Sequence, residues 1–292
     1  MKSIMSYGRR FAHSTLDLDA PVVSLARWPS WLTACLIGRP VLTKFKTDGL
    51  RMFLTPKLHT FGSTSIYIRR DNYEPELKAI SRFLRNGDVA LDIGGSFGIF
   101  ALFMSSYVGP TGKVYSFEPG QFSFAQLSAN VRLNNRSDRI VLHNVAASNE
   151  KAAIRLAHLH DSPVNFSIGE IADVQGETVQ ADRIDDIVPE GDQNRVRFIK
   201  IDVEGYELTA LKGCRNIIER NRPVIMFEVS CSALERQRLR PDDIYNFLAG
   251  FGYGFEILED GKFVSINDFR EGNIFAIAKN ERGVDNPKLN RS

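Results

Sequence analysis

Short continuous apolar runs and helical apolar stripes alternate along the chain from residue 88 onward. Continuous apolar runs bounded by polar or turn residues are typical of strands buried in a parallel sheet. Five such strands are expected, over residues 88–93, 113–118, 140–145, 196–202 and 224–229. Helices are expected over residues 98–107 and 122–133, from Gly205 to about 220, and over 241–249. This alternation predicts an α/β fold in which helices cover both faces of a mostly parallel sheet.

The C-terminal part is predicted to add two or three short strands, at about 253–258, 262–265 and 274–278. Residues 281–292 are polar and are predicted to form a tail. A helix is also expected over residues 74–85, where Leu77, Ile80 and Leu84 fall on one stripe at helical spacing.

The first 60 residues contain prolines that predict short pieces, with one or two strands among them. These prolines are Pro21, Pro29, Pro40 and Pro56. We therefore expect an N-terminal extension over residues 1–72 that packs on a main domain over residues 73–280.

Two tryptophans in this extension leave two interpretations open. Trp28 and Trp31, flanked by Arg27 and Arg39, could contact a membrane surface or could belong to a cap packed on the main domain. The packed cap is the preferred interpretation. The apolar run from Trp31 to Ile37 is much too short to span a bilayer, so no transmembrane segment is expected.

The overall composition is that of an ordinary globular protein, with 43% hydrophobic and 25% charged residues among 292. A net charge of +2 argues against a nucleic-acid partner, for which a basic stripe would be expected. Cys35, Cys214 and Cys231 are far apart and form no C-x-x-C pair, which indicates a reducing compartment and predicts a cytoplasmic protein. The oligomeric state is left open by these features.

A glycine-rich turn directly follows the first predicted strand of the alternating region. It has the form Asp92-x-Gly94-x-Ser96-x-Gly98, and an apolar helix follows it. Glycines in such a turn let backbone N–H groups approach a ligand at the start of a helix. Glu118 ends the next strand, where a carboxylate can accept both hydroxyls of a ribose. The turn and Glu118 together favour a nucleoside site over an ordinary glycine turn of an α/β protein.

Acidic residues also follow the fourth and fifth strands. Asp202 and Glu204 are two positions apart, so in an extended chain they would lie on one face. Two acids at a buried strand end need a cation, a hydroxyl donor or water, which makes them the candidate catalytic residues. Glu207 falls in the first turn of the next helix and is expected to be structural. Glu228 places another acid at a carboxyl end.

A polar run over residues 158–167 follows the third strand, on the side where a substrate should bind. It is either a surface loop or a lid over the acceptor. A metal site at His158, His160 and Asp161 is the least favoured interpretation, because the sequence offers no helical i, i+4 histidine pair there. No metal is therefore predicted.

These motifs resemble the FkbM family of S-adenosylmethionine-dependent methyltransferases over about residues 73–280. The strings that carry the resemblance are Asp92 to Gly98, Phe117-Glu118-Pro119, Asn144 to Ser148, Ile184-Asp185-Asp186 and Ile199 to Glu207. The family's turn usually has Ala-Asn where this chain has Gly95-Ser96, and its second proline after the glutamate is replaced by Gln121. Neither change removes a group that the cofactor needs.

The resemblance implies a class I Rossmann-like methyltransferase fold, with a seven-stranded sheet whose last strand is antiparallel. It also implies O-methylation of a sugar, glycolipid or polyketide-type acceptor, with S-adenosylmethionine as cofactor. The expected cofactor residues are Asp92, Gly94, Gly95, Ser96, Gly98 and Glu118, with Asn144 and Ala146 beside the adenine.

Three alternatives to this assignment remain at the level of the sequence. A divalent metal between Asp202 and Glu228 could acidify the acceptor in place of a carboxylate base. A non-catalytic nucleotide-binding module could use the same turn without turnover. An NAD-dependent oxidoreductase is disfavoured because the turn is not G-x-G-x-x-G.

Overall fold

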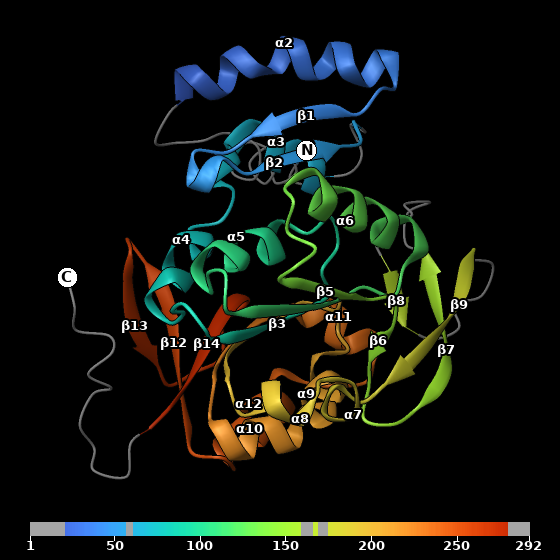
Figure 1. Cartoon of the computed structure of the whole chain (residues 1–292). Coiled ribbons are helices and arrows are strands. Elements are labelled where there is room, and N and C mark those ends of the chain that lie inside the picture. Colours follow the sequence, from blue (N-terminus) through green and yellow to red (C-terminus); the bar gives the residue numbers. More distant parts are fainter. Residues whose placement is uncertain (1–20, 57–60, 159–165, 169–174, 280–292) are drawn as a thin grey trace, which may run out of the picture. The chain divides into compact units, whose positions relative to one another are not determined.

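The computed structural model describes residues 21–56, 61–158, 166–168 and 175–279 (Figure 1). These residues fall into two compact units, one within residues 1–78 and the other within residues 79–292. Within the described ranges, no helix combines the length and the apolarity that crossing a bilayer requires.

The N-terminal unit consists of helices and one β-hairpin. Its elements are α2 (Pro21–Ile37), β1 (Val41–Lys44), η1 (Thr47–Gly49), β2 (Arg51–Leu54), α3 (Phe61–Arg69), η2 (Arg70–Asn72) and the start of α4 (Glu76–Ala79). Strands β1 and β2 pair antiparallel. α2 packs on α3, where the Trp31 ring stacks on Tyr67 with centroids 4.8 Å apart and its Nε1 donates to Thr64 Oγ1. This contact explains why Trp31 is fully buried.

The prediction that prolines divide the first 60 residues into short pieces is wrong for α2, which continues through Pro29. A proline inside a helix removes one backbone hydrogen bond. Pro29 lies on the exposed side of α2, where water can satisfy the carbonyl group that loses its partner. One or two short strands were expected in this region, and the structure has two, β1 and β2.

The helix expected over residues 74–85 is only partly formed. α4 ends at Ala79 and a 3₁₀ turn, η3 (Ile80–Arg82), replaces the rest. Leu77, Ile80 and Leu84 are nevertheless buried, as the apolar stripe predicted.

The C-terminal unit is built around an eight-stranded sheet (Figure 1). Its order is β13 (Lys262–Ile266), β12 (Tyr253–Glu259), β14 (Gly272–Ala278), β11 (Val224–Val229), β10 (Val196–Ile201), β3 (Val89–Ile93), β4 (Lys113–Phe117) and β5 (Ile140–His143). The five strands from β11 to β5 are parallel, and β14 is antiparallel to β11 and β12. This confirms the mostly parallel Rossmann-like sheet with an antiparallel last strand, but the count of seven is wrong. The β12–β13 hairpin supplies the eighth strand.

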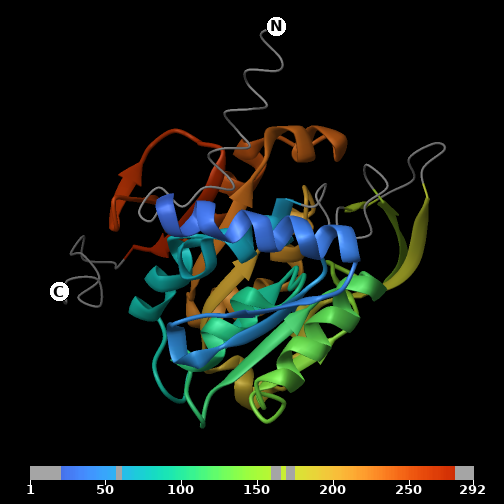
Figure 2. The ribbon, with the colours of Figure 1, turned by 90° about the horizontal axis from the view of Figure 1, so that it is seen from above.

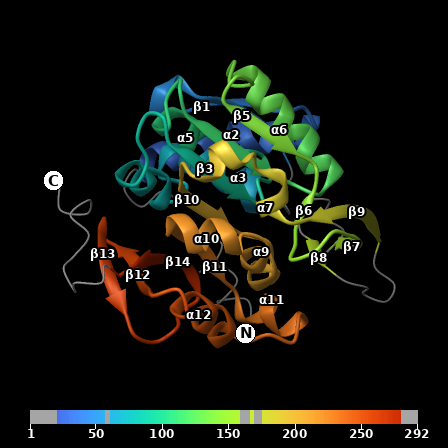
Figure 3. The same ribbon diagram turned by 60° about the horizontal axis from the view of Figure 1, so that its bottom comes forward.

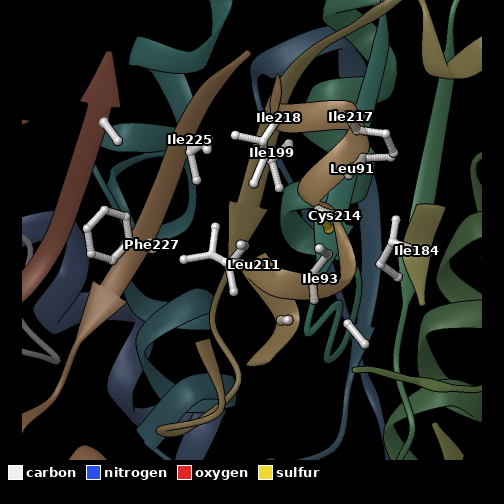
Figure 4. Packing of buried hydrophobic residues seen from close by; sticks show 14 of the residues in the cluster. Leu91, Ile93, Ile184, Ile199, Leu211, Cys214, Ile217, Ile218, Ile225 and Phe227 are labelled. Carbon is white, nitrogen blue, oxygen red and sulfur yellow. The ribbon is translucent and has the colours of Figure 1, made fainter. Parts of the chain in front are cut away.

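Helices cover both faces of this sheet, as Figures 1 and 3 show. They are α5 (Ile99–Tyr107), α6 (Gln121–Leu133), α7 (Ile184–Ile187), α8 (Glu190–Gln193), α9 (Glu207–Gly213), α10 (Arg215–Asn221), α11 (Cys231–Arg236) and α12 (Pro241–Ala249). On the face of α9 and α10, Leu91, Ile199 and Phe227 from the strands pack with Leu211 and Ile217 from the helices (Figure 4). Side chains of alternate strand residues reach this core because successive residues point to opposite faces.

A smaller four-stranded sheet follows the third predicted strand. Its order is β6 (Ala146–Ala147), β9 (Gly176–Asp182), β7 (Ala152–His158) and β8 (Phe166–Ile168). Leu156, Val179 and Ala181 form its own small core. Most of the predicted acceptor lid, residues 159–165, lies outside the described residues.

Candidate functional site

The glycine turn lies between β3 and α5 and is held against two neighbouring strands. Gly94 and Gly98 have φ values of 80° and 90°, which favour glycine. A Cβ atom at Gly94 would overlap the backbone oxygen of Asp202, the first residue after β10. The backbone N–H groups of Gly94 and Gly95 both donate to the carbonyl of Phe117, at the end of β4. The turn is therefore fixed between the ends of β10 and β4.

Glu118 lies directly beside this turn, as its position at the end of β4 predicted. Its Oε2 accepts from the Ser96 N–H at 2.8 Å, and its Oε1 accepts from the Gly120 N–H at 2.9 Å. Burial raises the pKa of Glu118 to about 7, although both backbone bonds favour the charged form. Each carboxylate oxygen has two lone pairs, so Glu118 retains acceptor capacity for two hydroxyl groups.

Asp92 is completely buried one strand away from Glu118. Its Oδ2 accepts from Ser116 Oγ at 3.0 Å. Burial raises the pKa of the Asp92 carboxyl, and the positive charge of Lys200 opposes this rise. Lys200, Asp92 and Ser116 are register partners on three adjacent strands, so they form one polar row inside the sheet.

Asn144 and Ala146 lie beyond the end of β5. The Asn144 Nδ2 donates to the carbonyl oxygens of Glu118 and Pro119, at 2.9 Å each. Asn144 therefore fixes the backbone of the segment that carries Glu118. Ala146 begins β6 and is buried.

The backbone after β10 is not extended, so the predicted geometry of Asp202 and Glu204 is wrong. The strand ends at Ile201, and Glu204 has a φ of 54° followed by Gly205 at 101°. Left-handed backbone at a glutamate is uncommon and is held in place by its surroundings. The two acids are brought together by a tight turn in place of a strand.

Both acids are partly exposed and each has a basic partner. Asp202 Oδ2 lies 3.4 Å from Lys200 Nζ, and Glu204 Oε2 lies 3.9 Å from Arg236 NH2. Their side chains are 41% and 47% exposed, so both can reach a bound molecule. Burial and the charge of Asp202 raise the pKa of Glu204.

Lys200 is the functional candidate that the sequence analysis missed. Its side chain is only 4% exposed, and its Nζ donates to the Gly94 carbonyl at 3.0 Å. The ammonium group also lies 5.0 Å from the centroid of the Phe100 ring. It thus connects the glycine turn with Asp202. The available signal was a lysine between two isoleucines in a predicted buried strand, because a buried lysine requires partners.

Glu207 has the structural role that its position predicted. Its Oε1 accepts from the N–H groups of Val203 and Gly205, both at 3.1 Å. These bonds close the turn that presents Asp202 and Glu204. Burial raises the pKa of Glu207 to about 7.

Two metal sites were considered from the sequence. Among the described residues, no group of three His, Cys, Asp or Glu side chains could hold a metal ion. His160 and Asp161 lie outside those residues. His158 Nε2 lies 3.4 Å from Glu177 Oε1, and Glu177 Oε2 accepts from the Gln121 N–H at 3.3 Å. The small sheet therefore reaches the start of α6, three residues after Glu118.

The chain matches the methyltransferase FkbM domain over residues 92–256, more than half of its length. Two curated relatives are "Methyltransferase 1" of Beauveria bassiana, 29% identical, and "Methyltransferase sdnD" of Sordaria araneosa, 28% identical. Each match covers 42% of this chain, with 57% of the first relative and 59% of the second. The chain thus spans less than two thirds of the length of these relatives.

A solved structure, the methyltransferase FkbM from Methylobacillus flagellatus KT, is 17% identical with a TM-score of 0.45. The match covers 88% of this chain and 60% of that one. The domain match includes the glycine turn, Glu118, Lys200 and the acidic turn after β10. The chain belongs to the FkbM methyltransferase family.

Proposed function

We propose that the protein transfers a methyl group from S-adenosylmethionine to a hydroxyl oxygen of a sugar, glycolipid or polyketide-type molecule. The observation that carries this proposal is the convergence of the glycine turn, Glu118 and two half-exposed acids at one sheet edge. Ligands bind at the carboxyl ends of strands in folds of this kind. The acceptor class rests on the family resemblance.

The residues at this edge fit an adenosine-containing cofactor. Glu118 would accept the ribose hydroxyls, and the turn from Gly94 to Gly98 would bring backbone close to the ligand. Asn144 and Ala146 would lie beside the adenine. When bound, S-adenosylmethionine supplies a methyl group activated by a positively charged sulfur.

The acidic turn after β10 would act on the acceptor. An alcohol becomes a good nucleophile when a nearby base takes its proton, and a carboxylate with a raised pKa is better suited to this than an ordinary one. Glu204 has a raised pKa and a partly exposed side chain, so we propose that its carboxylate accepts the hydroxyl proton. Asp202, paired with Lys200, would orient the acceptor by hydrogen bonding.

The test compares cofactor binding with methyl transfer. Calorimetry with S-adenosylhomocysteine and with NAD separates a methyltransferase from an oxidoreductase, and we expect binding of the former only. Glu118→Ala should weaken S-adenosylhomocysteine binding by roughly tenfold or more, because it removes charged acceptors of ribose hydroxyls. Glu190→Gln, an exposed change in α8, is the control.

A second measurement identifies the acceptor. Small-molecule extracts are incubated with the protein and methyl-labelled S-adenosylmethionine, and labelled products are found by mass spectrometry. A labelled O-methyl product supports the proposal. Cofactor binding without any labelled product would favour the non-catalytic nucleotide-binding module.

A further inference from the structure

The outer side of α2 carries a stripe of exposed apolar side chains. Val22, Leu25, Leu32 and Leu36 are spaced by three, seven and four residues, so they lie along one side of the helix. Their exposed fractions are 77%, 56%, 43% and 90%. Single exposed apolar residues are common, but a contiguous exposed stripe marks an interaction surface.

The opposite side of α2 already has its packing partners within the N-terminal unit. Ser24 and Trp31 are buried, and Trp31 stacks on Tyr67 of α3. In Figure 2, α2 is seen along its length from the side away from α3. One side of α2 is therefore packed within this unit, and the exposed apolar stripe lies on the other side.

Basic residues outnumber acidic ones in the sequence around this stripe, and the acids nearest to it are Asp19 and Asp48. Residues 20–47 contain Arg27, Arg39, Lys44 and Lys46 and no Asp or Glu. Arg39, Lys44 and Lys46 are exposed. Residues 1–78 as a whole contain twelve Lys and Arg against six Asp and Glu. A helix with an apolar stripe in basic surroundings has the chemistry that binds an anionic lipid surface.

We infer that this stripe of α2 docks the protein on the surface of a bilayer that contains anionic phospholipids. A second copy of the chain fits the stripe less well, because two strongly basic units would repel each other. Pro29 also interrupts the stripe at its centre, where a helix pair would need regular interdigitation. The inference is independent of the proposed methyl transfer.

The experiment uses the full chain and sedimentation of vesicles made from equal parts of phosphatidylglycerol and phosphatidylcholine. We expect the wild-type protein to bind these vesicles and to bind pure phosphatidylcholine vesicles at least tenfold less. The variant Leu25→Ser/Leu32→Ser/Leu36→Ser should lose binding by roughly tenfold or more, because three apolar side chains no longer enter the lipid. Removing Arg39 and Lys44 should weaken binding roughly fivefold for each charge.

The control places the same kind of change on exposed apolar residues of the other unit. Val264→Ser/Phe269→Ser should leave vesicle binding unchanged. Circular dichroism melting confirms that each variant is folded. Wild-type protein that does not bind anionic vesicles, or a stripe variant that binds as well as wild type, would overturn the inference. A wild-type dimer that the stripe variant converts to a monomer would also overturn it, since a second copy would then cover the stripe.

Discussion

At Lys200 a buried ammonium group contacts both halves of the candidate site. It donates to the carbonyl of Gly94 in the glycine turn and pairs with Asp202 in the acidic turn. It also offsets the charge of Asp92, its register partner on β3. A positive charge among several acids keeps them close together without mutual repulsion.

Lys200→Met should therefore weaken both S-adenosylhomocysteine binding and methyl transfer. The variant leaves the Gly94 carbonyl and Asp202 without a charged partner, and a hydrogen bond to a charged group contributes about 1.5–3 kcal/mol. That range corresponds to a loss of roughly tenfold to a hundredfold in affinity. Lys262→Met, an exposed lysine of β13, is the matched control. Calorimetry that finds the affinity of the Lys200 variant equal to wild type would rule out this role.

The two acids after β10 can be separated by their effects on the pH dependence of the rate. Glu204→Gln should lower methyl transfer by roughly 10²–10⁴ and remove the acidic limb of the pH–rate profile, because a base must be deprotonated. The rate of the wild type should fall as the pH falls through the raised pKa of Glu204. Asp202→Asn should lower the rate but keep the acidic limb. Steady-state rates at saturating cofactor and acceptor, measured across pH, check this assignment.

Two other outcomes would contradict the assignment of Glu204 as the base. If Asp202→Asn removes the acidic limb and Glu204→Gln does not, Asp202 is the base. If neither change affects turnover, the acids only stabilise the end of the strand. Cofactor affinity, measured in parallel, should change much less than turnover for both variants.

The sequence could predict the site residues that lie at strand ends, because strand ends follow from apolar runs. Glu118 and Asp202 were found in this way. Lys200 was missed because an isolated lysine in a strand gives no indication of what it contacts. The turn at Glu204 was missed because its left-handed backbone depends on the packing of Gly205 against Ala233 and on the bonds to Glu207.

At the scale of the elements, the short turn between β10 and α9 depends on one buried side chain, Glu207. Glu207 closes it with two hydrogen bonds from inside a buried environment, and the same burial raises the pKa of Glu207 to about 7. A carboxyl whose pKa is raised on folding stabilises the protein below its unfolded pKa of about 4.5, and this contribution is lost as the pH rises through 7.

Glu207→Gln should therefore change how stability depends on pH. The amide stays neutral at every pH, so the melting temperature of the variant relative to wild type should increase as the pH is raised from about 5 to 8. Thermal melts followed by circular dichroism at several pH values measure this difference. Glu219→Gln, an exposed change in α10, should show a constant difference across the same range. A constant difference for Glu207→Gln as well would mean that Glu207 is charged throughout.

The sequence predicted an element well where its apolar pattern matches its burial in the folded protein. Strands β3, β4, β10 and β11 are buried in a parallel sheet, so their apolar runs identify them and their bounds differ from the predictions by about one residue. The small sheet is not among the predicted elements, because β6 has only two residues, β8 only three, and β9 lacks a continuous apolar run. α2 was missed because the effect of Pro29 depends on which side of the helix meets water.

At the scale of the whole molecule, every proposed cofactor and catalytic residue lies in the C-terminal unit. The core on the α9 and α10 side of the main sheet also lies in this unit. The sequence-based boundary between extension and main domain, at residue 72, stays a prediction, as does the packing of one on the other.

A fragment of residues 73–280 should therefore fold and bind S-adenosylhomocysteine. Cooperative thermal melting and calorimetry on the fragment and on the full chain check this expectation, with the heat of binding as the common readout. The Glu118→Ala form of the fragment serves as its control. A fragment that melts cooperatively but does not bind would show that the extension contributes to the cofactor site.

The position of β14 has a consequence for synthesis on the ribosome. β14 lies between β11 and β12 and pairs with both, yet it is made after them. Until residue 278 has left the exit tunnel, a nascent chain carries the edge of β11 and the β12–β13 hairpin without the strand that joins them. Open strand edges pair readily with other chains. We therefore expect a nascent chain that stalls before residue 278 to be aggregation-prone, although it already contains the glycine turn.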